Sequence, residues 1–405
     1  MKTFNVDCKV ITPLFMGGAD QQAELRTQSI NGLLRWWFRV AGGSIEDEKR
    51  IFGWAGETSN QGLVRVKIER EEFNATEQIE ENQKIADEIL RLLKKRKDEL
   101  EEEIETAKGY QKDKLLKRKR NIEIQIEKVK GILEKLESAK NNSREFSEDL
   151  LKEIQKLIFL LEGYRYLGFS LEMNNRDFKP LGLTFNLKIS FHPKANEEDI
   201  KKFFCALWLA FNLGNFGSRA RRGFGSIKIE KIEENGSNIT NNCYGLNFVP
   251  SGNLRDWINN NLNEIKKILN QPRKDIPNLF YNFEIYIFGS NNDWQNLLDQ
   301  AGREYLSFRK QKPIDDRIVF GLPIVAVRKY KDLRRASPLM FKILEVDENK
   351  YVLLLIVMKP NEKRKFIFHP DEQNPPIKNN VMWNLLSDFV SKFKNISRFE
   401  KIYPP

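Results

Sequence analysis

A short segment rich in glycine and arginine carries the strongest chemical signal in this sequence. It reads NFGSRARRGFGS over residues 215–226. Glycine tolerates positive φ and has no Cβ, so backbone N–H groups can approach an anion while guanidinium groups add charge-assisted hydrogen bonds. The pattern predicts a loop that binds a phosphate backbone, and the alternative is a surface turn with solvated arginines. The residues predicted to bind are Gly217, Ser218, Arg219, Arg221, Arg222, Gly223 and Gly225.

Four aromatic residues near these basic positions could either stack on bases or pack in the core. Phe216 and Phe224 lie inside the glycine-rich loop, where apolar residues often anchor a loop, so anchoring is the favoured interpretation. Trp36 and Trp37 are adjacent on a predicted helix and therefore point about 100° apart. We expect both tryptophans to lie in the core.

Arginines on the same predicted helix form a second candidate surface. Arg35 and Arg39 are four residues apart and share one helix face, and Arg26 precedes the helix. Together these three residues are predicted to form a basic ridge that binds the same polyanion. The alternative is ion pairing, worth about 0 to 1 kcal/mol per exposed pair. The candidate carboxylates are those of Glu24, Glu46 and Asp47.

A further basic cluster lies in the second half of the chain. Arg334 and Arg335 follow Lys329 and Lys331. A cluster of this kind can extend a track for a polyanion or contact another subunit, and the sequence leaves both interpretations open.

Candidates for catalysis are few. Metal-independent RNA cleavage needs a general base and a general acid, and the two histidines of the chain, His192 and His369, each precede a proline at the predicted end of a strand. A turn-forming role is typical of that position. The Asp315-Asp316 pair is isolated, and no compact carboxylate set indicates a two-metal site. The residues therefore predict a non-catalytic protein.

Composition limits the class of protein further. The 405 residues include 68 Lys and Arg against 57 Asp and Glu, a formal charge of +11, which fits a polyanionic partner. Three scattered cysteines indicate neither a disulfide framework nor a structural metal, so no cofactor is predicted. Because the sequence lacks a long apolar run, we expect a cytoplasmic protein without a membrane segment.

The first part of the chain has the pattern of a small α+β domain. Alternating residues predict strands over 4–11, 63–68, 183–191 and 227–232. Apolar stripes predict one helix capped by Ser29 and ending at Gly42-Gly43, and another over 200–211. The resulting order, strand, helix, strand, strand, helix, strand, is that of a ferredoxin-like fold with an antiparallel sheet.

A segment of different composition interrupts this domain. Residues 77–140 contain no proline and only two glycines, and their apolar residues recur at helical spacing on both sides of Gly109. This pattern predicts a helical hairpin, followed by a third helix over 148–162 that Gly163 ends. Its balanced charges favour a tolerated elaboration over a protein-binding arm, and both interpretations stay open.

The remainder of the chain predicts a second α+β domain whose strand order is open. Residues 233–247 are polar and are interpreted as a linker. The predicted domains are therefore 1–235, with an insertion at about 72–162, and 236–405. Predicted helices cover 254–269 and 381–393, and predicted strands cover 280–288, 324–328, 340–346 and 351–358.

Three segments taken together resemble a known family. They are TQSINGLLRWWFR over 27–39, IFG over 51–53, and the glycine-rich loop over 217–226. Together they resemble the RAMP superfamily, and within it the large two-domain Cmr subunits of type III-B CRISPR effector complexes. The predicted hairpin departs from the compact family core, and in the second half only RRASPL over 334–339 matches.

The resemblance implies an α+β protein with two ferredoxin-like (RRM-like) domains in tandem, the first interrupted by an inserted antiparallel helical coiled coil. It implies a non-catalytic RNA-binding subunit that contacts guide and target RNA near the guide 3′ end, beside other Cmr subunits. Two alternatives stay open, a metal-independent guide-processing endoribonuclease and a protein scaffold that uses its coiled coil. The implied RNA-binding residues outside the loop are Arg26, Arg35, Arg39, Arg334 and Arg335.

Overall fold

The computed structural model divides the chain into two compact units. The first comprises residues 1–72, 177–297 and 304–405, and the second comprises residues 73–176 and 298–303. The residues described are 1–18, 20, 22–55, 59–72, 75–141, 147–171, 176–271, 277–321, 336–359, 384–393 and 399–404.

The first unit contains an antiparallel sheet with the strand order β2-β3-β1-β4-β5. The first four strands in sequence therefore lie in the order 2-3-1-4, which is the order of a ferredoxin-like split βαβ unit. The strands are β1 (Thr3–Val10), β2 (Val64–Glu72), β3 (Thr184–Phe191), β4 (Ile227–Glu234) and β5 (Ser237–Asn238).

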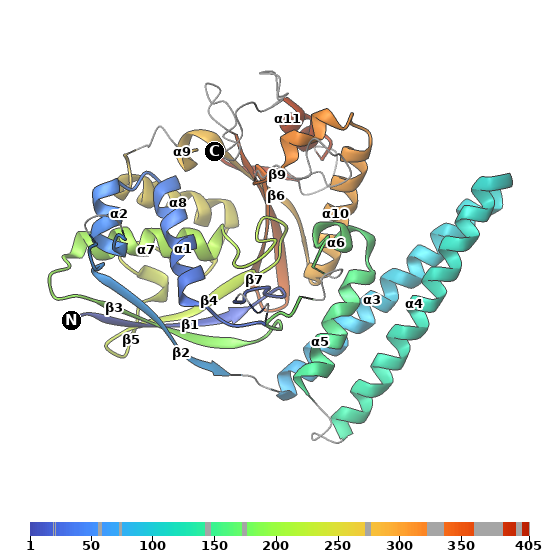
Figure 1. Cartoon of the computed structure of the whole chain (residues 1–405), viewed down its shortest axis with the longest axis horizontal. Coiled ribbons are helices and arrows are strands. Elements are labelled where there is room, and N and C mark those ends of the chain that lie inside the picture. The colour runs from blue at the N-terminus through green and yellow to red at the C-terminus, as the bar shows by residue number, and fades with distance from the viewer. Residues whose placement is uncertain are drawn as a thin grey trace. The chain divides into compact units, whose positions relative to one another are not determined.

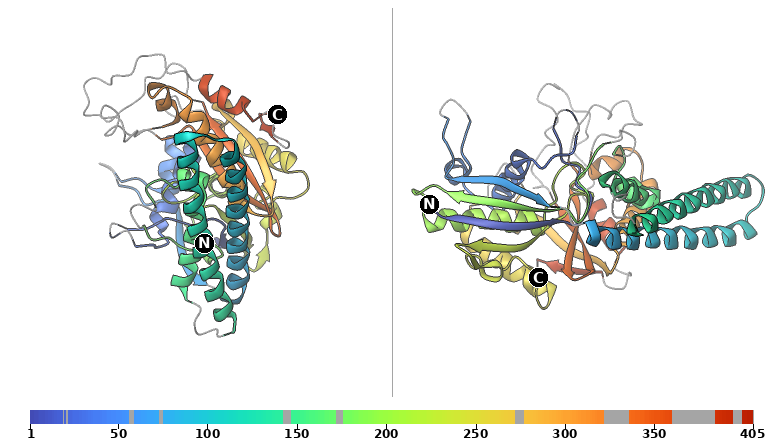
Figure 2. Two further views of the ribbon diagram at one scale, coloured as in Figure 1. Left: turned by 90° about the vertical axis from the view of Figure 1, so that its right-hand side faces the viewer. Right: turned by 90° about the horizontal axis from the view of Figure 1, so that it is seen from below.

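Period-two alternation builds this sheet, as the sequence predicts. In β3 every second residue is buried, and Leu187 pairs with Val6 of β1, which in turn pairs with Ile232 of β4. These apolar residues point to the face that helices cover. Seen from below, the strands present their other face to the viewer (Figure 2).

Three helices cover the apolar face of the first sheet (Figure 1). Helix α7 (Glu197–Asn212) begins at a capping box, in which the Asn196 side chain accepts from the Asp199 N–H and the Asp199 side chain accepts from the Asn196 N–H. This motif fixes the start of the predicted helix one turn before its apolar run. The helices are α1 (Thr27–Val40), α2 (Ile45–Phe52) and α7 (Glu197–Asn212).

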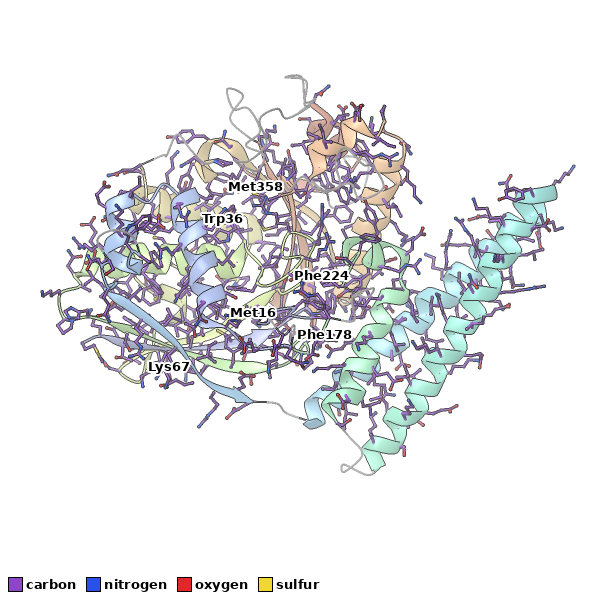
Figure 3. The ribbon with its side chains drawn as sticks, in the orientation of Figure 1. Met16, Trp36, Lys67, Phe178, Phe224 and Met358 are labelled. Atoms are coloured by element: carbon purple, nitrogen blue, oxygen red, sulfur yellow. The ribbon has the colours of Figure 1, made fainter. Side chains whose placement is uncertain are left out.

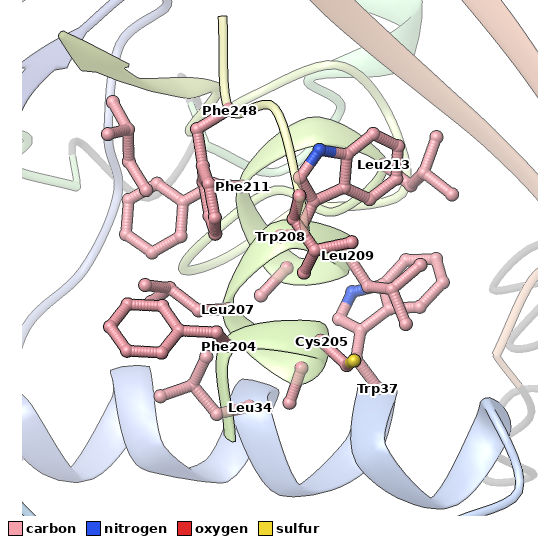
Figure 4. Packing of buried hydrophobic residues seen from close by; sticks show 14 of the residues in the cluster. Leu34, Trp37, Phe204, Cys205, Leu207, Trp208, Leu209, Phe211, Leu213 and Phe248 are labelled. Atoms are coloured by element: carbon pink, nitrogen blue, oxygen red, sulfur yellow. The ribbon is translucent and has the colours of Figure 1, made fainter. Parts of the chain in front are cut away.

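The core of the first unit is formed where α7 meets α1 (Figure 4). Trp37 and Trp208 are fully buried, and Trp208 donates its indole N–H to the Asn247 carbonyl at 2.8 Å. Aromatic edges meet in this layer, with 4.9 Å between the ring centres of Phe4 and Phe204. This packing sets where α7 ends and where the glycine-rich loop begins.

A second antiparallel sheet in the same unit repeats the first order. Its strands lie in the order β7-β8-β6-β9, again 2-3-1-4 in sequence, so the predicted mixed α+β class with two antiparallel sheets is confirmed. The strands are β6 (Phe283–Asn291), β7 (Leu339–Asp347), β8 (Lys350–Met358) and β9 (Glu400–Tyr403). The helices of this half are α8 (Leu254–Ile268), α9 (Leu279–Asn282), α10 (Trp294–Lys310), α11 (Asn384–Ser391) and the 3₁₀ helix η3 (Asp315–Phe320).

The second unit is helical. Its two long helices run side by side in opposite directions (Figures 1 and 2), and they meet at the break predicted at Gly109. Residues 298–303 of α10 belong to this unit. Its helices are α3 (Ala75–Thr106), α4 (Gly109–Asn141), α5 (Glu148–Lys156), η1 (Leu157–Leu160) and α6 (Glu162–Leu167).

Two predicted helix ends are wrong. Helix α1 begins at Thr27 with Arg26 at the N-cap, and the Ser29 N–H already bonds to the Arg26 carbonyl at 3.1 Å within the first turn. Gly163 does not end a helix, because it lies inside α6 where the backbone of α10 approaches. Glycine is needed there for contact, not for termination.

Two further segments differ from prediction. The predicted strand over 280–288 starts as helix α9, because the Asn278 side chain accepts from the Phe280 N–H at 2.9 Å, and β6 begins at Phe283. The predicted linker over 233–247 folds back on the first sheet, where the Thr240 hydroxyl accepts from the Ile232 N–H at 2.8 Å. The predicted strand over 324–328 lies outside the described residues.

The close contact at Gly163 generates a stability prediction. A Cβ at this position would lie 1.9 Å from the Asp299 carbonyl oxygen, so α6 would have to move away from α10. We expect Gly163→Ala to lower the free energy of unfolding by about 1 to 3 kcal/mol, measured from urea unfolding followed by circular dichroism. The control is Gly131→Ala in α4, where the added Cβ meets nothing within 4 Å, and alanine should raise stability by up to about 1 kcal/mol. Equal unfolding midpoints for the two variants would contradict this view of the contact.

Candidate nucleic-acid interface

Buried polar side chains hold the glycine-rich loop between α7 and β4. The Thr12 hydroxyl donates to the Gly223 carbonyl and accepts from the Ser226 N–H, both at 2.9 Å. The Ser226 hydroxyl donates to Asn215 Oδ1 at 2.7 Å, and Asn215 Nδ2 donates to the Phe341 carbonyl of β7 at 2.7 Å. All three side chains are buried, so each lost bond would leave an unsatisfied polar group.

The loop glycines serve backbone packing within the protein. Gly217, Gly223 and Gly225 have φ of +79°, +87° and +72°, in the left-handed region that favours glycine. A Cβ at Gly217 would lie 2.5 Å from the Phe15 carbonyl oxygen. The neighbouring Ser218 N–H donates to that same oxygen at 2.7 Å, so the loop is joined to the segment that follows β1.

The predicted anchoring role of the two loop phenylalanines is confirmed. Phe216 and Phe224 are buried, and the ring centre of Phe224 lies 5.8 Å from that of Phe15. Figure 3 shows Phe224 in the same region as Met16, the residue that follows Phe15. Trp37 is fully buried, as predicted, whereas Trp36 is only partly buried against the core.

Arg221 and Arg222 extend from the loop toward the second sheet. Arg221 donates to the Ser337 carbonyl, and its guanidinium carbon lies 5.4 Å from the ring centre of Trp36. Burial, with the nearby charge of Arg222, lowers the pKa of Arg221 to about 10, which leaves it cationic at neutral pH. Its backbone carbonyl accepts from the Phe341 N–H at 3.3 Å.

Arg222 makes a matching set of contacts. Its guanidinium carbon lies 4.7 Å from the ring centre of Tyr305, a distance typical of a cation–π contact. One guanidinium nitrogen also donates to the Phe320 carbonyl at 3.4 Å. Arg221 therefore joins the loop to the segment that leads into β7, and Arg222 joins it to α10 and η3.

Arg219 and its neighbours form the exposed tip of the loop. Arg219 has a φ of +58° and is exposed at the surface, although partial desolvation and the nearby charge of Arg222 lower the pKa of its guanidinium. Gly217 is also exposed, and Ser218 is half-buried. This tip is the part of the loop that a bound strand can reach.

Arg26 lies next to the segment that supports the tip. It donates to the Gly17 carbonyl at 3.3 Å and pairs with the Glu24 carboxylate at 2.8 Å, as one alternative predicted. The Ser218 N–H bonds to the Phe15 carbonyl, and Arg26 bonds to the Gly17 carbonyl. The short segment 15–17 therefore contacts both Arg26 and the residue before Arg219. We call the six residues the loop cluster, namely Gly17, Gly18, Arg26, Gly217, Ser218 and Arg219.

Two members of the loop cluster were absent from the predicted site. Gly17 and Gly18 end the loop after β1 and are half-buried. Their signal in the sequence is a double glycine in the loop after β1, a pattern that marks a turn but does not show which distant segment it meets.

Arg35 and Arg39 bind a carboxylate on the neighbouring helix. Their Nε atoms lie 3.1 Å and 3.3 Å from the same Glu48 oxygen, and the Glu48 side chain is 7% exposed. Arg35 also donates to the Gly53 carbonyl at 2.9 Å. The two arginines hold α2 against α1, with a carboxylate that the sequence did not single out. Their predicted contact with RNA stays a prediction, as does that of Arg334 and Arg335, which lie outside the described residues.

The described histidine has a structural contact. His192 is exposed, and its Nδ1 accepts from the Lys194 N–H at 3.2 Å within the turn after β3. His369 lies outside the described residues. In the described part of the chain, no three His, Cys, Asp or Glu side chains gather as a metal site would require. Within the same ranges, none of the helices is long and apolar enough to cross a bilayer.

The buried arginines generate a prediction about stability. We expect Arg221→Ala combined with Arg222→Ala to lower the free energy of unfolding by about 2 kcal/mol or more, because charge-assisted hydrogen bonds and cation–π contacts are lost together. Urea unfolding followed by tryptophan fluorescence measures this change. The control is Arg219→Ala at the exposed tip, which should stay within about 0.5 kcal/mol of wild type. An equal loss in the free energy of unfolding for both variants would show that the contacts of Arg221 and Arg222 do not stabilise the fold.

Comparisons with known proteins agree with this fold. A family model described as the RAMP superfamily matches residues 7–228, and a model described as Cmr1-like, C-terminal, matches residues 280–401. A crystal structure of Cmr1 from Pyrococcus furiosus in its apo form has a TM-score of 0.54 at 20% identity and covers 99% of each chain. That likeness shows a shared fold.

Curated relatives match the chain at low identity. The CRISPR system Cmr subunit Cmr1-1 of Pyrococcus furiosus is 29% identical over 240 residues, which are 55% of this chain and 66% of that protein. Cmr1-2 of the same organism is 26% identical over 238 residues, 56% of this chain and 95% of that protein. Because the superfamily model matches more than half of the chain, this protein belongs to the RAMP superfamily.

Proposed function

We propose that this chain is a non-catalytic RNA-binding subunit of a type III-B Cmr CRISPR effector complex. In that role it contacts guide and target RNA near the guide 3′ end and helps to capture the target beside other Cmr subunits. Membership of the RAMP superfamily and the similarity to Cmr subunits support this proposal. The observation that carries it is the loop cluster, in which two distant segments place Arg26 and Arg219 on one backbone support.

The chemistry of the loop cluster suits a sugar-phosphate backbone. RNA held by base pairing to a guide is bound mainly through phosphates and 2′-hydroxyls, because pairing supplies the sequence specificity. Arg219 places a cationic side chain at the exposed tip, next to the half-buried Ser218 and the exposed backbone of Gly217. The formal charge of +11 adds long-range attraction for a polyanion.

The remaining arginines act as positioning residues in this proposal. Arg221 and Arg222 fix the loop against Ser337, η3 and α10, and Arg35 and Arg39 fix α2 against α1. Because their contacts connect separate elements of the protein, we propose that they shape the surface that Arg26 and Arg219 present.

The proposal includes the division of the chain into two ferredoxin-like domains, 1–235 and 236–405. It also includes the identification of α3 and α4 as an antiparallel coiled coil inserted in the first domain. Ion pairs across the two helices support this identification, with Lys119 at 2.8 Å from Glu101 and Lys97 at 3.8 Å from Glu123. Buried residues at helical spacing, among them Leu93, Leu100, Ile126 and Val129, support it as well.

The salt dependence of RNA binding tests the loop cluster. We expect binding of single-stranded RNA to fall with salt at a log-log slope of about −0.7 per phosphate contacted, and Arg26→Ala with Arg219→Ala to flatten that slope by about one to two units. Fluorescence anisotropy with labelled RNA over a salt series measures it. The control is Arg91→Ala with Arg255→Ala, two arginines that are 59% and 42% exposed elsewhere. An equal change in the two double variants would remove the loop cluster from the RNA site.

The guide-processing alternative has a direct test. We expect the purified chain to leave repeat-containing RNA intact in the presence of a chelator, because the described histidine accepts a backbone N–H within a turn. Gel analysis of the RNA over time measures the outcome. A discrete cut that is present with wild type and lost in His192→Ala would establish the endoribonuclease instead.

A further inference from the structure

Helix α4 carries apolar residues on the side that faces away from α3. Its buried residues, among them Leu115, Ile126 and Val129, recur on one face and form the contact with α3. On the opposite side Tyr110 is 84% exposed and Ile124 is 68% exposed. Single exposed apolar residues are common on protein surfaces, so what matters here is their alignment with each other and with the charges around them.

These exposed residues are aligned along the helix. Tyr110, Lys117 and Ile124 are spaced seven residues apart, so they lie on nearly one line along α4. Arg120 and Lys128 follow at helical steps of three and four residues on the same face. We call these five residues the outer stripe, namely Tyr110, Lys117, Arg120, Ile124 and Lys128.

The cations of the outer stripe are available for a partner. Within the described ranges, Lys117, Arg120 and Lys128 are exposed and have no ion pair with a carboxylate. By contrast, Lys119 on the α3 side pairs with Glu101. The exposed acidic residues on the outer side are Asp113, Glu127 and Glu134, which share the heptad position of Arg120, and Glu127 already pairs with Lys130 at 2.7 Å. The stripe is therefore positive around an exposed isoleucine.

The outer side of α3 differs from that of α4 in its charge and in its lack of large exposed apolar residues. Near the same end of the hairpin it presents Asp98, Glu102 and Glu105, all exposed. Among the described residues of α3, no large apolar side chain is exposed. The combination of cations and exposed apolar groups therefore belongs to α4 and not to the hairpin as a whole.

We propose that the outer stripe of α4 docks an acidic amphipathic helix of another protein. The heptad spacing matches the repeat of a partner helix, whose apolar side would cover Ile124 and Tyr110. Carboxylates that flank this apolar side would meet Lys117, Arg120 and Lys128. RNA fits less well, because phosphates would use the cations but leave the isoleucine in water. The inference is independent of the loop cluster, which lies on other segments of the chain.

A defined peptide tests the proposal with the full-length chain. The probe is a labelled synthetic helix about four heptads long, with leucine at a and d, glutamate at e and g, and no lysine or arginine. We expect saturable binding in fluorescence anisotropy that weakens with salt. Ile124→Ser should weaken it about 10-fold, as expected for an apolar anchor, and Lys117→Glu with Arg120→Glu should weaken it more than about 10-fold.

The matched control changes charge on the other helix. Lys94→Glu with Lys95→Glu makes the same charge change at exposed residues of α3, and peptide affinity should stay within about 2-fold of wild type. Circular dichroism checks that all variants keep their helices. The proposal is overturned if wild type does not bind the peptide, or if the α3 control loses as much affinity as the α4 variant.

Two other occupants give distinct results. If the stripe binds RNA, Lys117→Glu with Arg120→Glu will lower affinity for single-stranded RNA while Ile124→Ser leaves it unchanged. If the stripe pairs with a second copy, wild type will dimerise in sedimentation and Ile124→Ser will be monomeric. Either result overturns docking of an acidic helix. Because RNA binding through Arg26 and Arg219 is measured separately, failure of this proposal is distinguishable from failure of the proposed function.

Discussion

The hydrogen bonds between the glycine-rich loop and strand β7 are the constraint on which the rest of the first unit depends. Asn215 donates to the Phe341 carbonyl, and the Phe341 N–H donates to the Arg221 carbonyl. Both bonds require α7 to end, and β4 to begin, at fixed positions beside the second sheet. Thr12 and Ser226 are buried and bonded within the same network, so a displaced loop would leave several polar groups unsatisfied.

This constraint explains why neighbouring arginines have different roles. Arg221 donates to the Ser337 carbonyl just before β7, and Arg222 donates to the Phe320 carbonyl of η3. Arg219 has a positive φ and stays exposed at the tip of the loop. Arg221 and Arg222 thus hold the loop rigidly, while Arg219, two and three positions before them, stays exposed. A rigid loop loses less conformational entropy when a phosphate binds.

Elements governed by local rules were predictable from sequence, and contacts between distant residues were not. Period-two alternation predicted β3, and the apolar stripe over 200–211 predicted α7, whose first turn and capping box the structure adds. The spacing of Arg35 and Arg39 placed them on one face, but nothing local indicates that Glu48 lies between them. Gly163 looked like a helix end because the same residue type serves termination and close packing, and the structure alone shows that α10 approaches it.

The distribution of charge on the helical hairpin was likewise not predictable from its composition. Its acids and bases are balanced in the sequence, and that balance favoured an inert elaboration. Composition adds charges from all sides of a helix, however, whereas a partner meets one side only. In the structure the exposed acids Asp98, Glu102 and Glu105 lie on α3, whereas the cations of the outer stripe lie on α4, so the charge is distributed unevenly between the two helices. The exposed Ile124 makes the positive side apolar as well, and that combination distinguishes a binding surface from a solvated one.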